Sequence, residues 1–173
     1  MAPKGLKMTS SPIQVSATVT ETAANTFTTE TIDLSLNALD QEVFVVTQLN
    51  LDVDAPDSIA ATTSAVSASL SSTLRTGVGS IANPNVIGAA ERIIVCNPGM
   101  TPDGGIPFDR EDPNFTALSE DYIGIIATSD AFLNIVGLNN NNAKQARVRV
   151  YGYRAKAEAA VYAALVQSQS LSA

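Results

Sequence analysis

An antiparallel all-β fold is predicted by three features of the sequence. Apolar and polar residues alternate along several segments, which places every second side chain on the same face of a strand. Turn-forming residues separate these segments at regular spacing, and a helical pattern occurs only near the C-terminus. The chain of 173 residues is 45% hydrophobic, so it can bury the core of one domain. This combination is typical of an antiparallel sandwich, jelly roll or barrel.

Four strands are expected in the first half of the chain: Ile13–Thr20, Phe27–Leu36, Glu42–Val53 and Thr63–Leu74. A helix is the alternative for the last of them, but its serine and threonine content favours a strand. The segment Asn37–Asp40 predicts a tight connection between the second and third strands. Within Glu42–Val53 the inward-facing positions change parity between Val46 and Leu49, which indicates a bulge in a central strand.

The second half of the chain begins with segments rich in turn residues. Glycine and proline predict a loop over Gly77–Gly88, followed by a short strand at Glu91–Cys96. Residues Asn97–Asn114 form the longest irregular segment. Loops of that length in compact domains are usually functional or interfacial.

Three apolar runs follow, and they are Tyr122–Ile126, Phe132–Leu138 and Arg147–Tyr153. Four asparagines, Asn139–Asn142, separate the last two runs, and asparagine tolerates the left-handed backbone conformation that turns require. We therefore expect a β-hairpin here. Alanine and apolar residues at helical spacing over 155–167 predict a short helix.

The expected organisation has three parts. Residues 1–12 form an N-terminal arm, residues 13–154 form an eight-stranded antiparallel sandwich of jelly-roll type, and residues 155–173 form an alanine-rich tail, helical or extended. Met1–Ser11 lacks the apolar region of a signal peptide, and no apolar run approaches the length of a membrane span. A soluble product made in a cytoplasm is expected.

Composition argues against several classes of function. The net charge of −7 disfavours strong nucleic-acid binding, and the charged fraction of only 16% favours an oligomer. The chain has no histidine, and its one cysteine, Cys96, is expected to be a buried apolar residue. Zinc sites, disulfides and histidine-based catalysis are therefore not expected. A serine–lysine pair with Lys144 or Lys156 as base is only formally open, so we do not expect an enzyme.

The strand near residue 150 carries the strongest candidate site. Alternation places Arg147, Arg149, Tyr151 and Tyr153 on one face, and Lys156 follows shortly afterwards. Arginine and tyrosine are enriched at protein interfaces, so a contact with carboxylates of a second copy is the preferred interpretation. A solvated or intramolecular face is one alternative. Stacking on nucleic-acid bases is the other.

Two clusters of acidic residues are candidate metal sites. Asp52, Asp54 and Asp57 alternate at the end of a strand and offer oxygen ligands that suit Ca²⁺, although the glycine and the final glutamate of a calcium loop are missing. Asp109, Glu111 and Asp112 form the second cluster. No cofactor is expected other than Ca²⁺ at the weak candidate site of Asp52, Asp54 and Asp57.

Two short motifs have ordinary explanations. Thr76–Ser80 is glycine-rich but lacks the lysine of a phosphate loop, so a turn is expected there. Asn114–Thr116 matches the acceptor pattern for N-glycosylation, which we interpret as accidental because no signal peptide is expected.

From Ile13 to Arg154, the pattern of eight strands with long loops resembles the small single-jelly-roll coat proteins of viruses. The resemblance implies a capsid subunit that assembles into an icosahedral shell with copies of itself, and with other virion proteins as further partners. It implies location in the virion after synthesis in the host cytoplasm. The first twenty residues depart from this family because they carry only Lys4 and Lys7 as basic residues, not a basic arm. A shell over a membrane or over a packaged double-stranded DNA genome fits that departure.

Two other functions remain open at this point. One is a capsid decoration protein, or a filament subunit joined by strand donation, in which residues 1–19 would be the donated segment. The other is a calcium-dependent ligand-binding β-sandwich that uses Asp52, Asp54 and Asp57.

Overall fold

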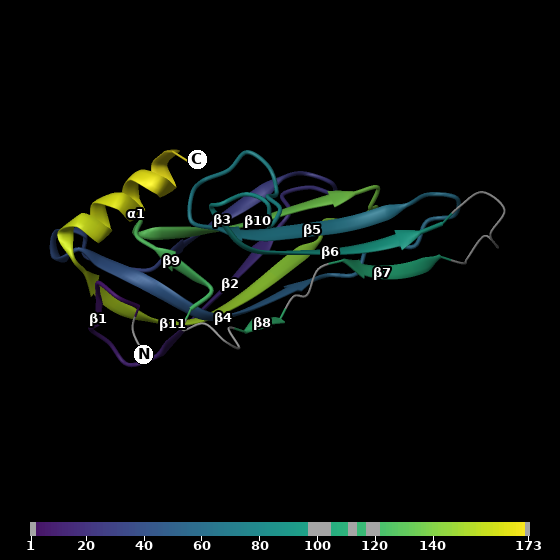
Figure 1. The fold of residues 1–173 in the computed structure, drawn as a ribbon. Helices are drawn as coiled ribbons and strands as arrows, with labels where there is room; N and C mark the ends of the chain where they lie inside the picture. Colours follow the sequence, from purple (N-terminus) through teal and green to yellow (C-terminus); the bar gives the residue numbers. More distant parts are fainter. Residues whose placement is uncertain (1–2, 97–104, 111–113, 117–121, 172–173) are drawn as a thin grey trace.

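Two antiparallel sheets lie face to face in the computed structural model, which describes residues 3–96, 105–110, 114–116 and 122–171 (Figure 1). Sheet A contains β1 (Leu6–Met8), β2 (Ile13–Thr20), β4 (Glu42–Val53), β8 (Asn114–Thr116), β9 (Gly124–Ile126) and β11 (Gln145–Ala157). Sheet B contains β3 (Thr28–Asp33), β5 (Ser64–Ser71), β6 (Val86–Val95), β7 (Ile106–Arg110) and β10 (Asp130–Leu138). A 3₁₀ turn, Ala38–Asp40, connects β3 to β4, and helix α1 (Ala159–Leu171) follows β11.

The order of the strands is that of a jelly roll. In sheet A, β11 lies between β2 and β4, and β4 pairs on its other side with β8 and β9. In sheet B the order is β3-β10-β5-β6-β7. If β8 and β9 are taken as one interrupted strand, and β1 and β7 as additions, eight strands distribute between the sheets in the double Greek-key order. The predicted fold class is confirmed.

The predicted bulge in the central strand β4 is also confirmed. Gln48 pairs with Tyr151 and Val46 pairs with Gly152, so Thr47 is an extra residue in the ladder. Its hydroxyl donates to the carbonyl of Tyr151 at 3.2 Å. Because of this extra residue, both Val46 and Leu49 face the core.

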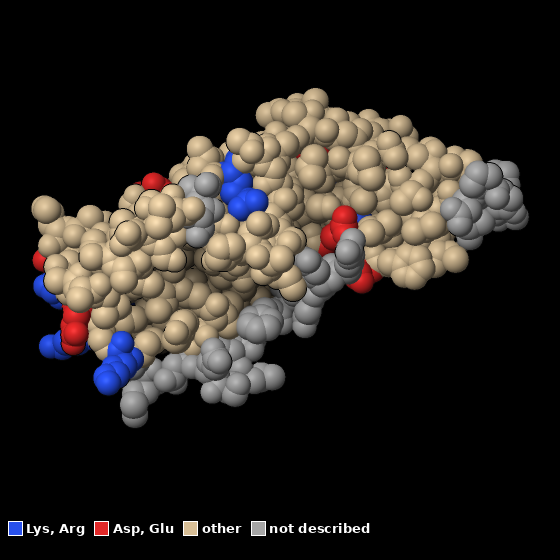
Figure 2. Space-filling model, turned by 45° about the horizontal axis from the view of Figure 1, so that its top comes forward, with Lys and Arg blue, Asp and Glu red and all other residues tan. Residues whose placement is uncertain are grey.

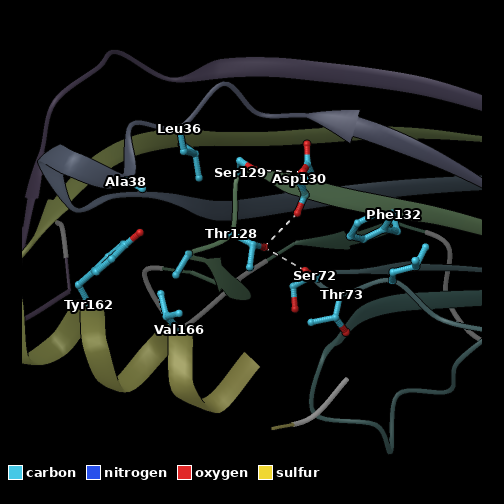
Figure 3. A pocket seen from close by; sticks show the side chains of 12 residues that line it. Leu36, Ala38, Ser72, Thr73, Thr128, Ser129, Asp130, Phe132, Tyr162 and Val166 are labelled. Atoms are coloured by element: carbon cyan, nitrogen blue, oxygen red, sulfur yellow. Dashed lines mark hydrogen bonds between the residues drawn. The ribbon is translucent and has the colours of Figure 1, made fainter. Parts of the chain in front are cut away.

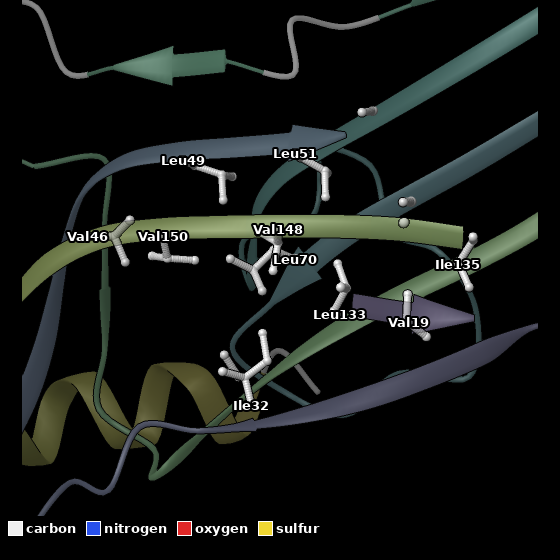
Figure 4. Packing of buried hydrophobic residues seen from close by; sticks show 14 of the residues in the cluster. Val19, Ile32, Val46, Leu49, Leu51, Leu70, Leu133, Ile135, Val148 and Val150 are labelled. Carbon is white, nitrogen blue, oxygen red and sulfur yellow. The ribbon is translucent and has the colours of Figure 1, made fainter. Parts of the chain in front are cut away.

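The main core lies between the two sheets, where side chains from both point toward one another (Figure 4). Alternate residues of each strand supply it, as period-two patterning requires. Sheet A contributes Val46, Leu49, Leu51, Val148 and Val150, and sheet B contributes Ile32, Leu70, Leu133 and Ile135.

A second apolar cluster lies under α1, at the end of the molecule where β1 and the last residues of β11 lie (Figure 1). Val43, Val45 and Ala155 form it together with Val161 and Leu165 of the helix. The side-chain amide of Gln169 ties the helix to the segment around β9, because it donates to the carbonyl of Ile125 at 2.8 Å and accepts from the N–H of Ala127 at 3.1 Å. The helix predicted over 155–167 therefore starts later, because Ala155 and Ala157 are strand residues that pair with Val43 and Leu6.

The predicted hairpin between β10 and β11 is wrong. The Asn139–Asn142 turn reverses the chain, but β10 belongs to sheet B and β11 belongs to sheet A. The reason lies in the turn itself: Asn140 donates to the carbonyl of Ala65 on β5 and accepts from the N–H of Asp57, which holds the turn at a corner between the sheets. Turn residues specify a reversal of direction and not the sheet that the next strand joins.

Two segments that were predicted to be irregular contain strands. β6 begins at Val86, inside the loop predicted over Gly77–Gly88. Gly88 is a strand residue whose missing side chain makes room for Leu49 of the facing sheet, because an added Cβ would overlap the Leu49 side chain. β7 lies within the predicted irregular segment Asn97–Asn114, and β8 begins at the last residue of that segment. β7 tolerates Pro107 because it is an edge strand of sheet B. The other residues of that segment, apart from Gly105, lie outside the described residues.

Candidate functional site

The outward face of sheet A contains the predicted Arg–Tyr strand. Arg147, Arg149 and Tyr151 of β11 point away from the main core, whereas Val148 and Val150 between them are buried within it. On either side, their cross-strand neighbours are polar. These neighbours are Thr18, Ser16 and Gln14 on β2 and Asp52, Asn50 and Gln48 on β4.

Arg147 is engaged in a network of charges within the chain. Its guanidinium lies 3.0 Å from Asp54 and 3.6 Å from Asp52. Asp52 also lies 3.6 Å from Arg92, a residue of β6 in the opposite sheet. Arg92 lies 3.2 Å from Asp109 and donates to the carbonyl of Val53 at 2.6 Å. The network links the two sheets, and within the described part of the chain no ion pair is formed by Arg149.

The five predicted interface residues do not form one surface. Tyr153 is only 5% exposed, because the second apolar cluster and α1 cover it. Lys156 is exposed, but it lies nearer the end of β11, opposite Lys7 of β1 and Glu42 of β4. Lys156 and Lys7 line a hollow of about 440 Å³ together with Gln41 and Glu158, and Arg147, Arg149 and Tyr151 are not part of its lining. Arg147, Arg149 and Tyr151 therefore share one outward face, and of the two arginines only Arg147 is in an ion pair with a described residue.

The three carboxylates proposed for calcium each have other partners. Asp52 and Asp54 bind the arginines described above, and Asp54 also accepts from the N–H of Gln145 at 3.0 Å. Asp57 lies 2.5 Å from the ammonium of Lys144. Among the residues that the structure describes, no three potential metal ligands come together. The geometry gives the calcium hypothesis no support.

Asp57 belongs to a polar corner that the sequence pattern did not reveal. Its carboxylate accepts from Lys144 and from the backbone N–H groups of Asn141 and Asn142 at 2.8 and 3.3 Å. The Lys144 hydrogen bond, followed by these backbone N–H groups and the lysine charge, lowers the pKa of Asp57 against an opposing effect of burial. Glu21, at 3% exposure, accepts from the backbone of Gly137 and Lys144 at 2.6 and 2.9 Å. The asparagine run was the one signal in the sequence for this corner.

A pocket of about 450 Å³ opens beside α1 (Figure 3). Tyr162 and Val166 of the helix point toward it from one side, and Leu36 lies opposite them. The hydroxyl of Thr128 donates within the chain, to the carbonyls of Ser72 and Asp130 at 3.0 and 3.1 Å. The pocket lining combines these apolar side chains with a polar pair, in which the hydroxyl of Ser129 donates to the carboxylate of Asp130 at 2.9 Å.

The remaining sequence candidates have structural roles or lie partly outside the described residues. Cys96 is 3% exposed, as expected of a buried apolar residue. Lys144 binds Asp57 and not a serine. Asp109 binds Arg92, whereas Glu111 and Asp112 lie outside the described residues. Asn114–Thr116 forms β8.

Comparisons with known proteins add little to this geometry. No protein-family model matches the chain, and no curated protein matches it. A solved structure from desmodium yellow mottle tymovirus is similar in fold, at 10% sequence identity and a TM-score of 0.28. The match covers 91% of this chain and 93% of the viral one. In the part of the chain that the structure describes, no helix is long and apolar enough to cross a membrane.

Proposed function

We propose that this protein is a self-assembling capsid subunit of a virus shell. The observation that carries the proposal is the strand order: β2, β11, β4 and β8/β9 face β3, β10, β5 and β6. This double Greek key is the jelly roll, an architecture shared by viral capsid proteins, lectin domains and cupins. Because a fold alone does not define a function, the choice among these uses depends on the surface and the residue types.

The exposed surface supports assembly. Large apolar side chains that remain exposed include Ile106, Phe108 and Leu138, at 49%, 52% and 54%. The low charged fraction of 16% also suits surfaces that neighbours cover.

The alternatives have less support. A calcium-dependent lectin-like site would need Asp52, Asp54 and Asp57 to converge, and each is bound to a basic residue instead. Strand donation by residues 1–19 would require β1 and β2 to leave β11 of their own chain, with which both pair. Arg147 of sheet A is neutralised by neighbouring carboxylates, and the net charge of the chain is −7, which does not favour direct contact with a genome.

The proposal is tested by the mass distribution of the purified full-length protein. Analytical ultracentrifugation and negative-stain electron microscopy across a range of salt and protein concentrations should reveal closed shells. Filaments would favour the strand-donation alternative. A protein that stays monomeric or trimeric under all these conditions, and that binds only to shells built from another protein, would be a decoration protein instead.

A further inference from the structure

Along β5, β6 and β10, most of the described outward residues of sheet B are uncharged. Figure 2 views the side on which sheet B and α1 lie, and charged residues are sparse over its upper right part. The outward positions of β5 are Ala65, Ser67, Ser69 and Ser71, alternating with the core residues Val66, Ala68 and Leu70. On β6, Glu91 is outward, and its carboxylate accepts from the hydroxyl of Ser67 at 2.9 Å.

A loop of the same chain covers one half of this face. The N–H of Gly79, in the connection between β5 and β6, donates to the hydroxyl of Ser69 at 3.0 Å. Ser69, Ser71 and Ala89 are consequently buried, although they point away from the core. The chain therefore supplies its own cover over this half of sheet B.

The other half carries apolar side chains that remain exposed. Leu138 lies opposite Ala65, Ala65 lies opposite Ile93, and Ile93 lies opposite Phe108, so one row crosses four strands. Leu138 is 54% exposed and Phe108 is 52% exposed. The next pair along β6 and β7 adds Val95 and Ile106. We define the outer patch as Ile93, Val95, Ile106, Phe108 and Leu138.

Electrostatics favours a second copy of this chain as the partner for the outer patch. At a net charge of −7, two copies repel each other over most of their surface, and this repulsion is weakest where the face carries few charges. Depletion of charge around aromatic and aliphatic residues is the composition of an interface core.

Backbone pairing at the β7 edge of sheet B is disfavoured. β7 is one edge of this sheet in the described part of the chain, and Pro107 in its middle has no backbone N–H to donate to a further strand. Proline on an edge strand is a usual protection against edge-to-edge pairing. Side chains of the outer patch, which project from the sheet surface, are not affected by this restriction.

We propose that the outer patch is a docking surface for a second copy of this chain, and that this contact is one of those that build the shell. The inference rests on the proposed function for its biological role, but the contact itself is a property of the isolated protein. It joins copies through packed apolar side chains at the centre, with polar residues such as Ser67 at the margin.

The experiment compares two double variants with the wild type by sedimentation velocity over a concentration series, with negative-stain imaging of the same samples. Phe108→Ser with Leu138→Ser removes two exposed side chains of the outer patch. Leu39→Ser with Leu171→Ser removes two side chains that are 95% and 79% exposed elsewhere. Because all four side chains are more than half exposed, circular dichroism and melting temperature should show that both variants stay folded.

We expect the patch variant to weaken self-association at least about tenfold, and the control variant to change it less than about threefold. Equal weakening by both variants, or shells that form normally from the patch variant, would overturn the docking surface and leave the capsid proposal standing. Dimers that depend on the patch but never form shells would support the docking surface and contradict the capsid proposal. A wild type that remains monomeric at every concentration would remove the second copy as the partner.

Discussion

The outer faces of the two sheets differ in how their apolar residues are shielded from solvent. Sheet A is covered at one end by α1, and elsewhere it carries polar residues and the ion pairs of Arg147 with Asp52 and Asp54. Sheet B is covered over one half by the loop that contains Gly79, and over the other half it leaves apolar residues such as Phe108 exposed. The apolar residues on the outer face of sheet A are therefore covered by their own chain, whereas those of the outer patch on sheet B are left for a neighbouring copy to cover.

The largest effect should come from removing the cover of sheet A. Truncation after Ala157 deletes α1 and exposes Val43, Val45 and Tyr153, which are at most 5% exposed in the intact protein. Exposure of three such side chains should cost about 5 kcal/mol or more of unfolding free energy, which suffices to unfold many domains. Urea denaturation followed by circular dichroism measures this loss. By contrast, Phe108→Ser on sheet B should change the unfolding free energy by less than about 0.5 kcal/mol.

A truncated protein with the denaturation midpoint of the full chain would contradict this difference between the two sheets. It would mean that sheet A does not require its helix, and that both sheets leave apolar surface for neighbours. The point variant Gln169→Ala tests the same role of α1 with a smaller change to the protein. It removes the two hydrogen bonds that hold the helix to Ile125 and Ala127.

The next effect should come from the polar corner that joins the sheets. Asp57→Asn removes the ion pair with Lys144, whose side chain is 11% exposed, and should cost about 2 kcal/mol because a largely buried ammonium loses its partner. Lys144 and the backbone N–H groups of Asn141 and Asn142 hold the pKa of Asp57 below its usual 3.8. The pair therefore contributes stability above that pH, and the contribution is lost as the pH falls through the lowered pKa.

Unfolding free energies measured from pH 7 down to pH 2.5 check the sign of this effect. The wild type should lose its advantage over Asp57→Asn only in the acidic part of the range, whereas the difference should be constant near neutrality. A difference between the two proteins that is unchanged throughout the range would show that Asp57 does not stabilise the fold through its charge.

The sequence predicted the elements of the fold better than their assembly. Period-two patterning located β2 and β4 within a residue, and the parity change between Val46 and Leu49 located the bulge. The same patterning could not assign β10 and β11 to different sheets, because strands in both sheets alternate in the same way. That assignment depends on contacts such as the one from Asn140 to Ala65, which join residues distant in the sequence.

Only part of the candidate site was predicted, because alternation describes a single strand and not what packs against it. Alternation correctly placed Arg147, Arg149 and Tyr151 on one outward face. It also placed Tyr153 there, but a helix covers that position, and periodicity within one strand carries no information about what packs on top of it. The outer patch of sheet B was not predicted, because β7 contains a proline and lies in a segment that was predicted to be irregular.

A smaller effect should separate two neighbouring arginines of sheet A. Arg147→Glu places an acid beside Asp52 and Asp54 and should lower the unfolding free energy by about 1 kcal/mol. Arg149→Glu breaks no ion pair with a described residue and should change it by less than about 0.5 kcal/mol. Thermal denaturation measures both, and sedimentation velocity shows whether Arg149→Glu weakens self-association. Equal destabilisation by the two variants would mean that the network around Arg147 contributes nothing particular.

The smallest effect is expected from calcium. A Ca²⁺ ion at the end of β4 would have to displace Arg147 from Asp54 and Lys144 from Asp57, so it would gain carboxylate ligands only by leaving two cations without partners. EDTA or millimolar Ca²⁺ should therefore shift the melting temperature by less than about 1 °C. Saturating calcium at a true site would instead add about 2.7 kcal/mol at a hundredfold excess over the Kd, a shift of several degrees for a domain of this size. Such a shift, if abolished by Asp54→Asn with Asp57→Asn, would mean that sheet A also depends on an outside partner to complete its surface.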